Sequence, residues 1–126
     1  MINKKGWLTK AEKHISPNFD QRPKNTDIKL IVIHNISLPP ENFEPENVKK
    51  FFMNELDFET HKFFQEIRGL KVSSHFVIDR IGKIYQFVSV YDRAWHAGVS
   101  SFNNQENCND FSLGVELIGS DNTPFE

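Results

Sequence analysis

The sequence predicts an α+β fold in which helices pack against a mixed central β-sheet. Short runs of β-branched and aliphatic residues, typical of strands, flank a segment whose apolar residues recur at steps of three and four, as on one face of a helix. A length of 126 residues, 38% of them hydrophobic, suffices for one compact domain with a core. No internal repeat interrupts this pattern.

The first predicted strand covers residues 28–34 and ends in a histidine. Five of the six residues from Ile28 to Ile33 are apolar, so we expect a strand that is buried on both faces under helices. Open sheets carry their chemistry at the carboxyl ends of strands, and His34 stands at such an end. A strand-terminal histidine whose ring is satisfied by backbone groups is the alternative interpretation.

Residues 1–27 are polar and mixed in character. Turn signals surround Pro17 and Pro23, so we expect an extended arm with turns. Trp7 and Phe19 are the apolar side chains that we expect to pin this arm onto the domain.

Helices are predicted in the middle of the chain. Pro45 between two glutamates favours a first helical turn, and a second short helical pattern covers about residues 60–67. Phenylalanine-rich stripes at helical spacing indicate core packing rather than a ligand site. The apolar face of the first helix is predicted to contain Val48, Phe51, Phe52 and Leu56.

Three further strands are predicted after these helices. Residues 74–79 and 83–88 flank the turn at 80–82, whose glycine is typical of a hairpin. Residues 113–119 are apolar except for Glu116. The sheet core is thus expected within residues 28–126.

The carboxyl end resembles the start of a helix. Thr123-Pro124-Phe125-Glu126 has the spacing of a capping box, with proline suited to the first helical position. We therefore expect residues 1–126 to be the amino-terminal part of one incomplete domain in a longer protein.

Composition and charge exclude several classes of protein. Fifteen basic and seventeen acidic residues give a net charge of −2 without a basic face, which argues against nucleic acid as a partner. No apolar stretch follows Lys4 and Lys5, so we expect neither a secretory signal nor a membrane span, and a cytoplasmic location. Cys108, the single cysteine, cannot form an internal disulfide; it is either a small buried residue or a nucleophile with a histidine partner in space.

Three features stand outside the packing pattern. They are His34 with Asn35, the stretch Ala94–Ser100 that contains Trp95 and His96, and Glu116 inside an apolar strand. A carboxylate inside a strand is costly unless it forms a salt bridge, lies at an edge or has a function. No paired-cysteine or His-x-x-Glu-His spacing predicts a metal site locally, and His75 and His61 are interpreted as structural.

Several runs together identify a family resemblance. The runs are Gly6–Leu8, Ser16–Asn18, Arg22–Pro23, Val32–Pro40, Val72–Ile78, Arg93–Ser100 and Cys108–Leu117. Over essentially the whole chain and in the same order, they resemble the AmpD-type 1,6-anhydro-N-acetylmuramyl-L-alanine amidases.

This resemblance implies a zinc amidase of cell-wall recycling with a fold related to peptidoglycan-recognition domains. The enzyme cleaves the amide bond between 1,6-anhydro-N-acetylmuramic acid and L-alanine of muropeptides. One zinc ion is held by two histidines and an aspartate, of which His34 matches the first histidine. The other two ligands, and a lysine that stabilises the oxyanion, are implied downstream of Glu126.

The resemblance also assigns the remaining site residues. Glu116 matches the carboxylate that activates the zinc-bound water, acting as general base. The positions that line the muropeptide groove are matched by Asn35, Trp95, His96 and Ala97. Asn107 departs from the family pattern, in which a basic residue precedes Cys-Asn-Asp, and a weaker hold on a substrate carboxylate would follow.

A single histidine cannot hold a catalytic zinc ion. We therefore expect residues 1–126 alone neither to bind zinc tightly nor to hydrolyse muropeptides. A non-catalytic muropeptide-binding module of the same fold is the alternative function, and a structural domain without a ligand leaves Trp95, His96 and Glu116 unexplained. The expected partner is a small-molecule muropeptide, and the expected oligomeric state is a monomer.

Overall fold

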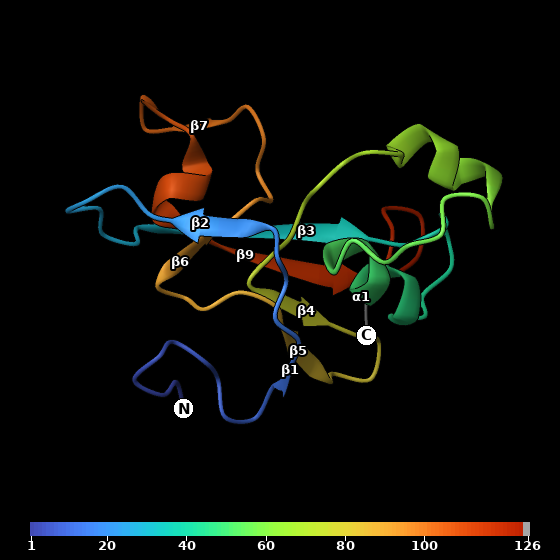
Figure 1. Cartoon of the computed structure of the whole chain (residues 1–126), viewed down its shortest axis with the longest axis horizontal. Coiled ribbons are helices and arrows are strands. Elements are labelled where there is room, and N and C mark those ends of the chain that lie inside the picture. Colours follow the sequence, from blue (N-terminus) through green and yellow to red (C-terminus); the bar gives the residue numbers. More distant parts are fainter. Residues whose placement is uncertain (125–126) are drawn as a thin grey trace.

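A five-stranded sheet organises the computed structural model, which describes residues 1–124 (Figure 1). Its strands are β1 (Glu12–Lys13), β3 (Leu30–Ile36), β4 (Phe76–Ile78), β5 (Ile84–Gln86) and β9 (Ser112–Ile118). The spatial order is β1-β5-β4-β9-β3. Strand β9 pairs in parallel with β3 and β4, β4 pairs antiparallel with β5, and β5 pairs in parallel with β1. The predicted mixed sheet is confirmed.

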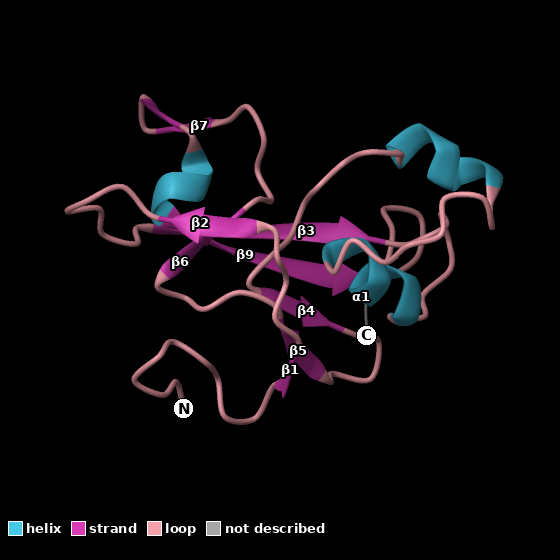
Figure 2. Cartoon of the chain, viewed as in Figure 1, coloured by secondary structure: helices cyan, strands magenta, loops and turns pink. Residues whose placement is uncertain are grey.

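Two small antiparallel ribbons and three short helices complete the described chain. Helices α1 and η1 gather at one end of the molecule and η2 at the other (Figure 2). The ribbons pair β2 (Phe19–Gln21) with β6 (Asp92–Ala94) and β7 (Ser101–Phe102) with β8 (Gln105–Glu106). The helices are α1 (Glu46–Phe52) and the 3₁₀ helices η1 (Lys62–Ile67) and η2 (Cys108–Phe111).

Helix α1 confirms the prediction that a helix begins near Pro45. Its buried face carries Val48, Phe51 and Phe52, and the Phe52 ring meets that of Phe87 edge-on, with 5.2 Å between centroids. Burying such side chains is the main contribution to the stability of the core. The helix ends earlier than predicted, so Leu56 is buried beyond its end rather than on its face.

The second predicted helix is the 3₁₀ helix η1. Its buried residue is Phe64. His61 precedes the helix, and its Nδ1 accepts a hydrogen bond from the Phe63 backbone N–H over 3.0 Å. His61 thus caps the free amide groups of a helix start, which agrees with its interpretation as structural.

The hairpin and the last strand lie where the sequence predicts them. Strands β4 and β5 are antiparallel neighbours, and Gly82 in their turn has a φ of +86°, a conformation that favours glycine. Strand β9 lies inside the sheet, paired with β3 on one side and β4 on the other.

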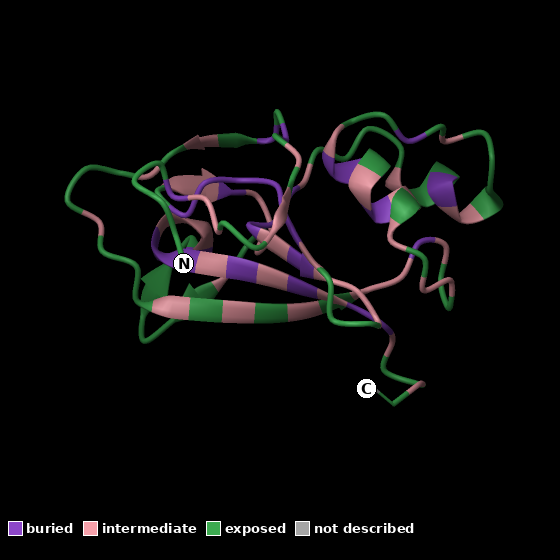
Figure 3. Ribbon diagram, turned by 90° about the horizontal axis from the view of Figure 1, so that it is seen from below, coloured by how far each residue is buried: buried purple, intermediate pink, exposed green. Residues whose placement is uncertain are grey.

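The prediction that the first strand is buried on both faces is wrong. Strand β3 lies at the edge of the sheet, and the side chains of Ile31 and Ile33 are 61% and 65% exposed. Figure 3 shows this strand alternating between half-buried and exposed residues. A strand covered on both faces and an edge strand with one exposed apolar face can both have a continuous apolar run. The sequence pattern therefore does not distinguish them.

Residues 1–27 add strands to two sheets instead of forming only an arm. Phe19 is 40% exposed, so it does not pin the segment as predicted. Polar anchors replace it: Ser16 Oγ donates a 2.5 Å hydrogen bond to the Phe52 carbonyl, and Asn18 Nδ2 donates one of 2.9 Å to the Val72 carbonyl. Both polar side chains are buried, and a buried polar anchor cannot be recognised from apolar residues in the sequence.

The predicted capping box at the carboxyl end lies partly outside the described residues, because it depends on Glu126. Thr123 forms an isolated bridge with Ser120, and its hydroxyl donates to Glu41. The helix predicted to start there stays a prediction.

Candidate active site

The site is built on the parallel pair β3 and β9. His34 and Glu116 are paired positions in their register. Because paired residues of adjacent strands point to the same face, both side chains lie on the face that also carries Ile118 and Val77 of the core. The exposed Ile31 and Ile33 point to the opposite face.

Glu116 is a buried carboxyl group that lacks a partner. Glu116 is only 8% exposed, and its Oε2 has no hydrogen-bond partner among residues 1–124. Burial raises its pKa to about 7. Within residues 1–124 it forms no ion pair, and β9 is not an edge strand. Both structural alternatives for this residue are thus wrong, and a carboxyl group with this pKa suits general acid–base catalysis at neutral pH.

His34 faces a second histidine. Its Nε2 lies 3.1 Å from Nδ1 of His96, with the two rings meeting edge-on. Burial lowers the pKa of His34. For His96, burial together with the neighbouring His34 and His75 lowers the pKa to about 3. Both rings are therefore neutral at physiological pH, the state in which a histidine can bind a metal.

The His96 ring lies directly on the backbone of β9. A Cβ atom at Gly114 would come within 2.5 Å of Cγ and Cδ2 of this ring. On the ring's far edge, Nε2 lies 3.1 Å from Oγ of Ser112. Neither Gly114 nor Ser112 was identified from the sequence; a glycine and a serine in a strand that also contains Glu116 were the available signal.

The loop after β6 is fixed by Asn109. Its Oδ1 accepts from the backbone N–H groups of His96 and Ala97 over 3.2 and 2.9 Å. Trp95 points its indole N–H toward Oδ1 of Asp20 at 3.3 Å. Three of the four predicted groove residues, Trp95, His96 and Ala97, are thus consecutive in one anchored loop.

Asn35 is not brought together with them. As the neighbour of His34 along a strand, it points to the opposite face, and its Nδ2 donates a 2.6 Å hydrogen bond to Oδ1 of Asp121. A role for Asn35 at the groove stays a prediction.

Arg22 is a site-supporting residue that the sequence did not reveal as such. Its half-buried guanidinium donates to the carbonyls of Asn109, Asp110, Val90 and Ser112 over 2.9–3.1 Å. The side chain ties η2 and the start of β9 to the segment before β6. Arginine suits this role because its donors form a fixed planar fork.

His75 has the structural role assigned to it from the sequence. It is fully buried, and burial is the main cause that lowers its pKa to about 4. Nδ1 accepts from the Gly114 N–H over 3.1 Å, so the proton resides on Nε2, 2.8 Å from the Asp92 carbonyl. Both nitrogens are used, which leaves none for a ligand.

The donor set for a metal is only partly present. His34 beside the unpaired Oε2 of Glu116 fits one ligand and a nearby carboxylate. Residues 1–124 contain no group of three histidine, cysteine, aspartate or glutamate side chains that could hold a metal ion. Further ligands would have to come from outside this set.

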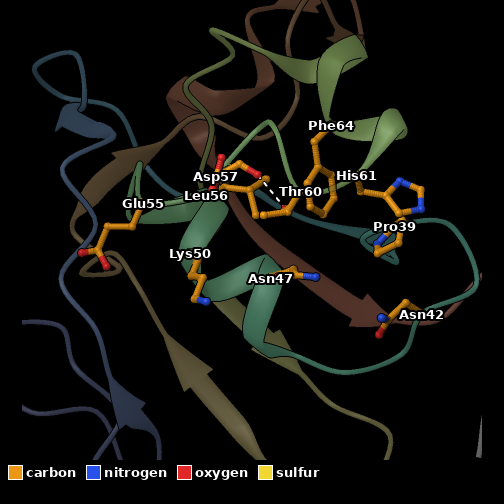
Figure 4. A pocket seen from close by; sticks show the side chains of 10 residues that line it. All are labelled: Pro39, Asn42, Asn47, Lys50, Glu55, Leu56, Asp57, Thr60, His61 and Phe64. Atoms are coloured by element: carbon orange, nitrogen blue, oxygen red, sulfur yellow. Dashed lines mark hydrogen bonds between the residues drawn. The ribbon is translucent and has the colours of Figure 1, made fainter.

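A separate cavity of about 420 Å³ lies between α1 and η1 (Figure 4). Asn47 and Lys50 of α1 line one side, and His61 and Phe64 line the other. Neither His34 nor Glu116 contributes to it. The cavity is therefore distinct from the pair on β3 and β9.

Residues 24–126 match the N-acetylmuramoyl-L-alanine amidase family. The chain belongs to this family. A 1,6-anhydro-N-acetylmuramyl-L-alanine amidase AmpD from Haemophilus influenzae is 52% identical over 121 residues, 96% of this chain and 66% of the relative. The corresponding AmpD of Escherichia coli is 45% identical over 99% of this chain and 68% of its own length.

A solved structure shows the same amidase fold. A crystal structure of a selenomethionine derivative of AmpD superposes with a TM-score of 0.95 at 44% identity, covering 99% of this chain and 70% of that one. The family resemblance and the α+β fold predicted from the sequence are confirmed. The chain spans about two thirds of the length of the curated relatives that it matches.

No helix among residues 1–124 is long and apolar enough to cross a membrane.

Proposed function

We propose that this amidase chain carries the His34–Glu116 half of a zinc-dependent site that hydrolyses muropeptides. The bond cleaved is the amide between 1,6-anhydro-N-acetylmuramic acid and L-alanine, the activity named for the relatives. Peptidoglycan recycling by a cytoplasmic monomer is the setting proposed with it. The remaining two zinc ligands, a histidine and an aspartate, are proposed to lie downstream of Glu126.

The buried, unpaired carboxyl oxygen of Glu116 beside His34 is the observation that supports this proposal most. A strand that buries a carboxyl without a partner loses stability, and such a cost is typical of functional sites. With its pKa raised to about 7, Glu116 exists in both protonation states near neutral pH. It can accept a proton at Oε2 and later donate it to the leaving amine.

Zinc, when bound, would polarise the amide carbonyl and lower the pKa of a bound water from about 15.7 to about 7. His34 would be one of its ligands. Trp95 and Ala97 in the loop fixed by Asn109 are proposed to contact the muropeptide. Their backbone is held in place before any ligand arrives, which reduces the entropy lost on binding.

A chimera tests the catalytic proposal. Residues 1–126 are joined to the final third of the Haemophilus influenzae relative, and hydrolysis of an anhydro-muropeptide is followed by chromatography beside the unextended chain. We expect the chimera to be active and the unextended chain inactive. Glu116→Gln in the chimera should lower kcat at least about 100-fold with zinc content unchanged, since the general base is removed.

Two results would contradict the proposal: comparable hydrolysis by the unextended chain, or unchanged kcat in the Glu116→Gln chimera. His34→Ala serves as the matched variant, because it should lose zinc as well as activity.

A non-catalytic muropeptide-binding module is the second candidate. It is favoured by the loop that contains Trp95 and Ala97, whose backbone is fixed by Asn109 without the help of any metal ligand. Calorimetry distinguishes the two: tight binding of intact muropeptide by a chimera that never cleaves it would support the binding module.

A further inference from the structure

We propose that His96 is a positioning residue for His34. Supported by Ser112, it holds Nε2 of His34, so that Nδ1 is the nitrogen that His34 offers to a metal ion. The second half of this proposal rests on the proposed function; the first half concerns the two histidine rings alone.

The half-buried His96 ring is held against β9 and the residues around it. Gly114 leaves space for it against β9, where a Cβ atom would lie 2.5 Å from two ring atoms. The ring of His75 meets it edge-on, with 6.2 Å between centroids. Oδ1 of Asn109 accepts a hydrogen bond from the backbone N–H of His96. A side chain so confined has one orientation, as a residue that orients another must.

Both nitrogens of His96 are already engaged. Nδ1 lies 3.1 Å from Nε2 of His34, and Nε2 lies 3.1 Å from Oγ of Ser112. No nitrogen of the ring is left for a hydrogen bond to a substrate. The groove role predicted for His96 is therefore replaced, in this proposal, by a role that acts through His34.

The pair also determines which nitrogen of His34 is free. A metal-bound nitrogen has no lone pair left for a hydrogen bond, so the nitrogen that contacts His96 must be the N–H donor when metal is bound. Histidine ligands typically donate their second N–H to a fixed acceptor, which sets the tautomer and orients the ring. Here that acceptor would be Nδ1 of His96.

Ser112 supplies the acceptor that the second ring nitrogen of His96 needs in this arrangement. If His96 accepts at Nδ1, its proton resides on Nε2 and needs an acceptor. The Ser112 hydroxyl can rotate to accept it, and Ser112 is fully buried beside the ring. Replacing Ser112 with alanine would leave a buried N–H without a partner, which is costly.

Nitrogen NMR of the metal-free chain at a pH where the rings are neutral tests the positioning half. The five histidines give five pairs of ring nitrogens, whose ¹⁵N shifts report which nitrogen carries the proton. We expect one fixed tautomer for both His34 and His96. Ser112→Ala should move the ring shifts of both toward the averaged values of a free imidazole, whereas the control Ser101→Ala, in the exposed strand β7, should move neither.

Zinc chloride added to the metal-free chimera, which carries the proposed downstream ligands, tests the ligand half. Stoichiometric zinc should shift Nδ1 of His34 and leave its contact with His96 intact. A zinc shift at Nε2, or a folded Ser112→Ala chain with unchanged His34 shifts, would overturn the proposal. Fixed tautomers with no zinc effect at either nitrogen would instead contradict His34 as a ligand, and with it the proposed function.

Discussion

His34 and Glu116 occupy paired positions on two parallel strands, yet among residues 1–124 Nε2 of His34 has a partner in His96 and Oε2 of Glu116 has none. Glu116 retains an unpaired buried oxygen, and its pKa is raised to about 7. The free energy of unfolding should therefore depend on pH, because a raised pKa means that the folded state holds the proton more tightly than the unfolded state.

We expect Glu116 to destabilise the protein as pH rises. Below pH 4.5 the carboxyl is protonated in both states; between 4.5 and about 7 only the folded state keeps its proton, and the free energy of unfolding falls. Glu116→Gln removes this titration. The free energy of unfolding of this variant minus that of the wild type, both measured by urea titration, should increase by up to about 3 kcal/mol from pH 4.5 to pH 8. A difference that does not change with pH would contradict the raised pKa.

Arg22→Lys should destabilise the protein despite keeping the charge. The guanidinium donates to four carbonyls on three segments, and an ammonium group cannot reach them in the same planar geometry. Losing partly buried hydrogen bonds from a charged donor costs roughly 1.5–3 kcal/mol. Urea unfolding measures the loss. Arg68→Lys, at an exposed ion pair with Glu59, is the matched control and should change the free energy by less than about 0.5 kcal/mol.

Substitutions on the exposed face of β3 should have little effect on stability. Ile31→Thr and Ile33→Thr together should change the free energy of unfolding by less than about 1 kcal/mol, because both side chains are mostly exposed. Binding of a hydrophobic dye to the native protein should fall. Val77→Ala, at a fully buried position of the same sheet, should cost about 2 kcal/mol. Unchanged dye binding in the double variant would show that this face is covered in solution.

Local patterns in the sequence predicted α1, η1 and four of the five strands of the main sheet. The β4–β5 hairpin follows from a glycine between two apolar runs, and α1 follows from proline, acid and apolar spacing. Burial of a strand is different, because it depends on neighbours that are distant in sequence. Ile31 and Ile33 could not reveal from their own identity that β3 lies at an edge.

The site was predictable only as far as single residues carry chemistry. His34 and Glu116 stood out as polar residues in apolar strands, and the structure pairs them. Gly114, Ser112 and Arg22 support them through a close approach, a hydroxyl rotor and a set of carbonyls. Such roles depend on contacts between residues that are distant in sequence. Spacing along the sequence does not reveal these contacts.

Acid should destabilise the protein through His75. Burial lowers its pKa to about 4, so between pH 6.5 and 4 the unfolded chain takes up a proton that the folded chain excludes. The free energy of unfolding should therefore fall by up to about 3 kcal/mol over this range. His75→Gln, which does not titrate, should be less stable at pH 7, because the Gly114 N–H loses its acceptor, but it should lose less stability on acidification. Urea unfolding at pH 7 and pH 4.5 measures both effects, and an equal loss in the two proteins would assign the acid sensitivity to other groups.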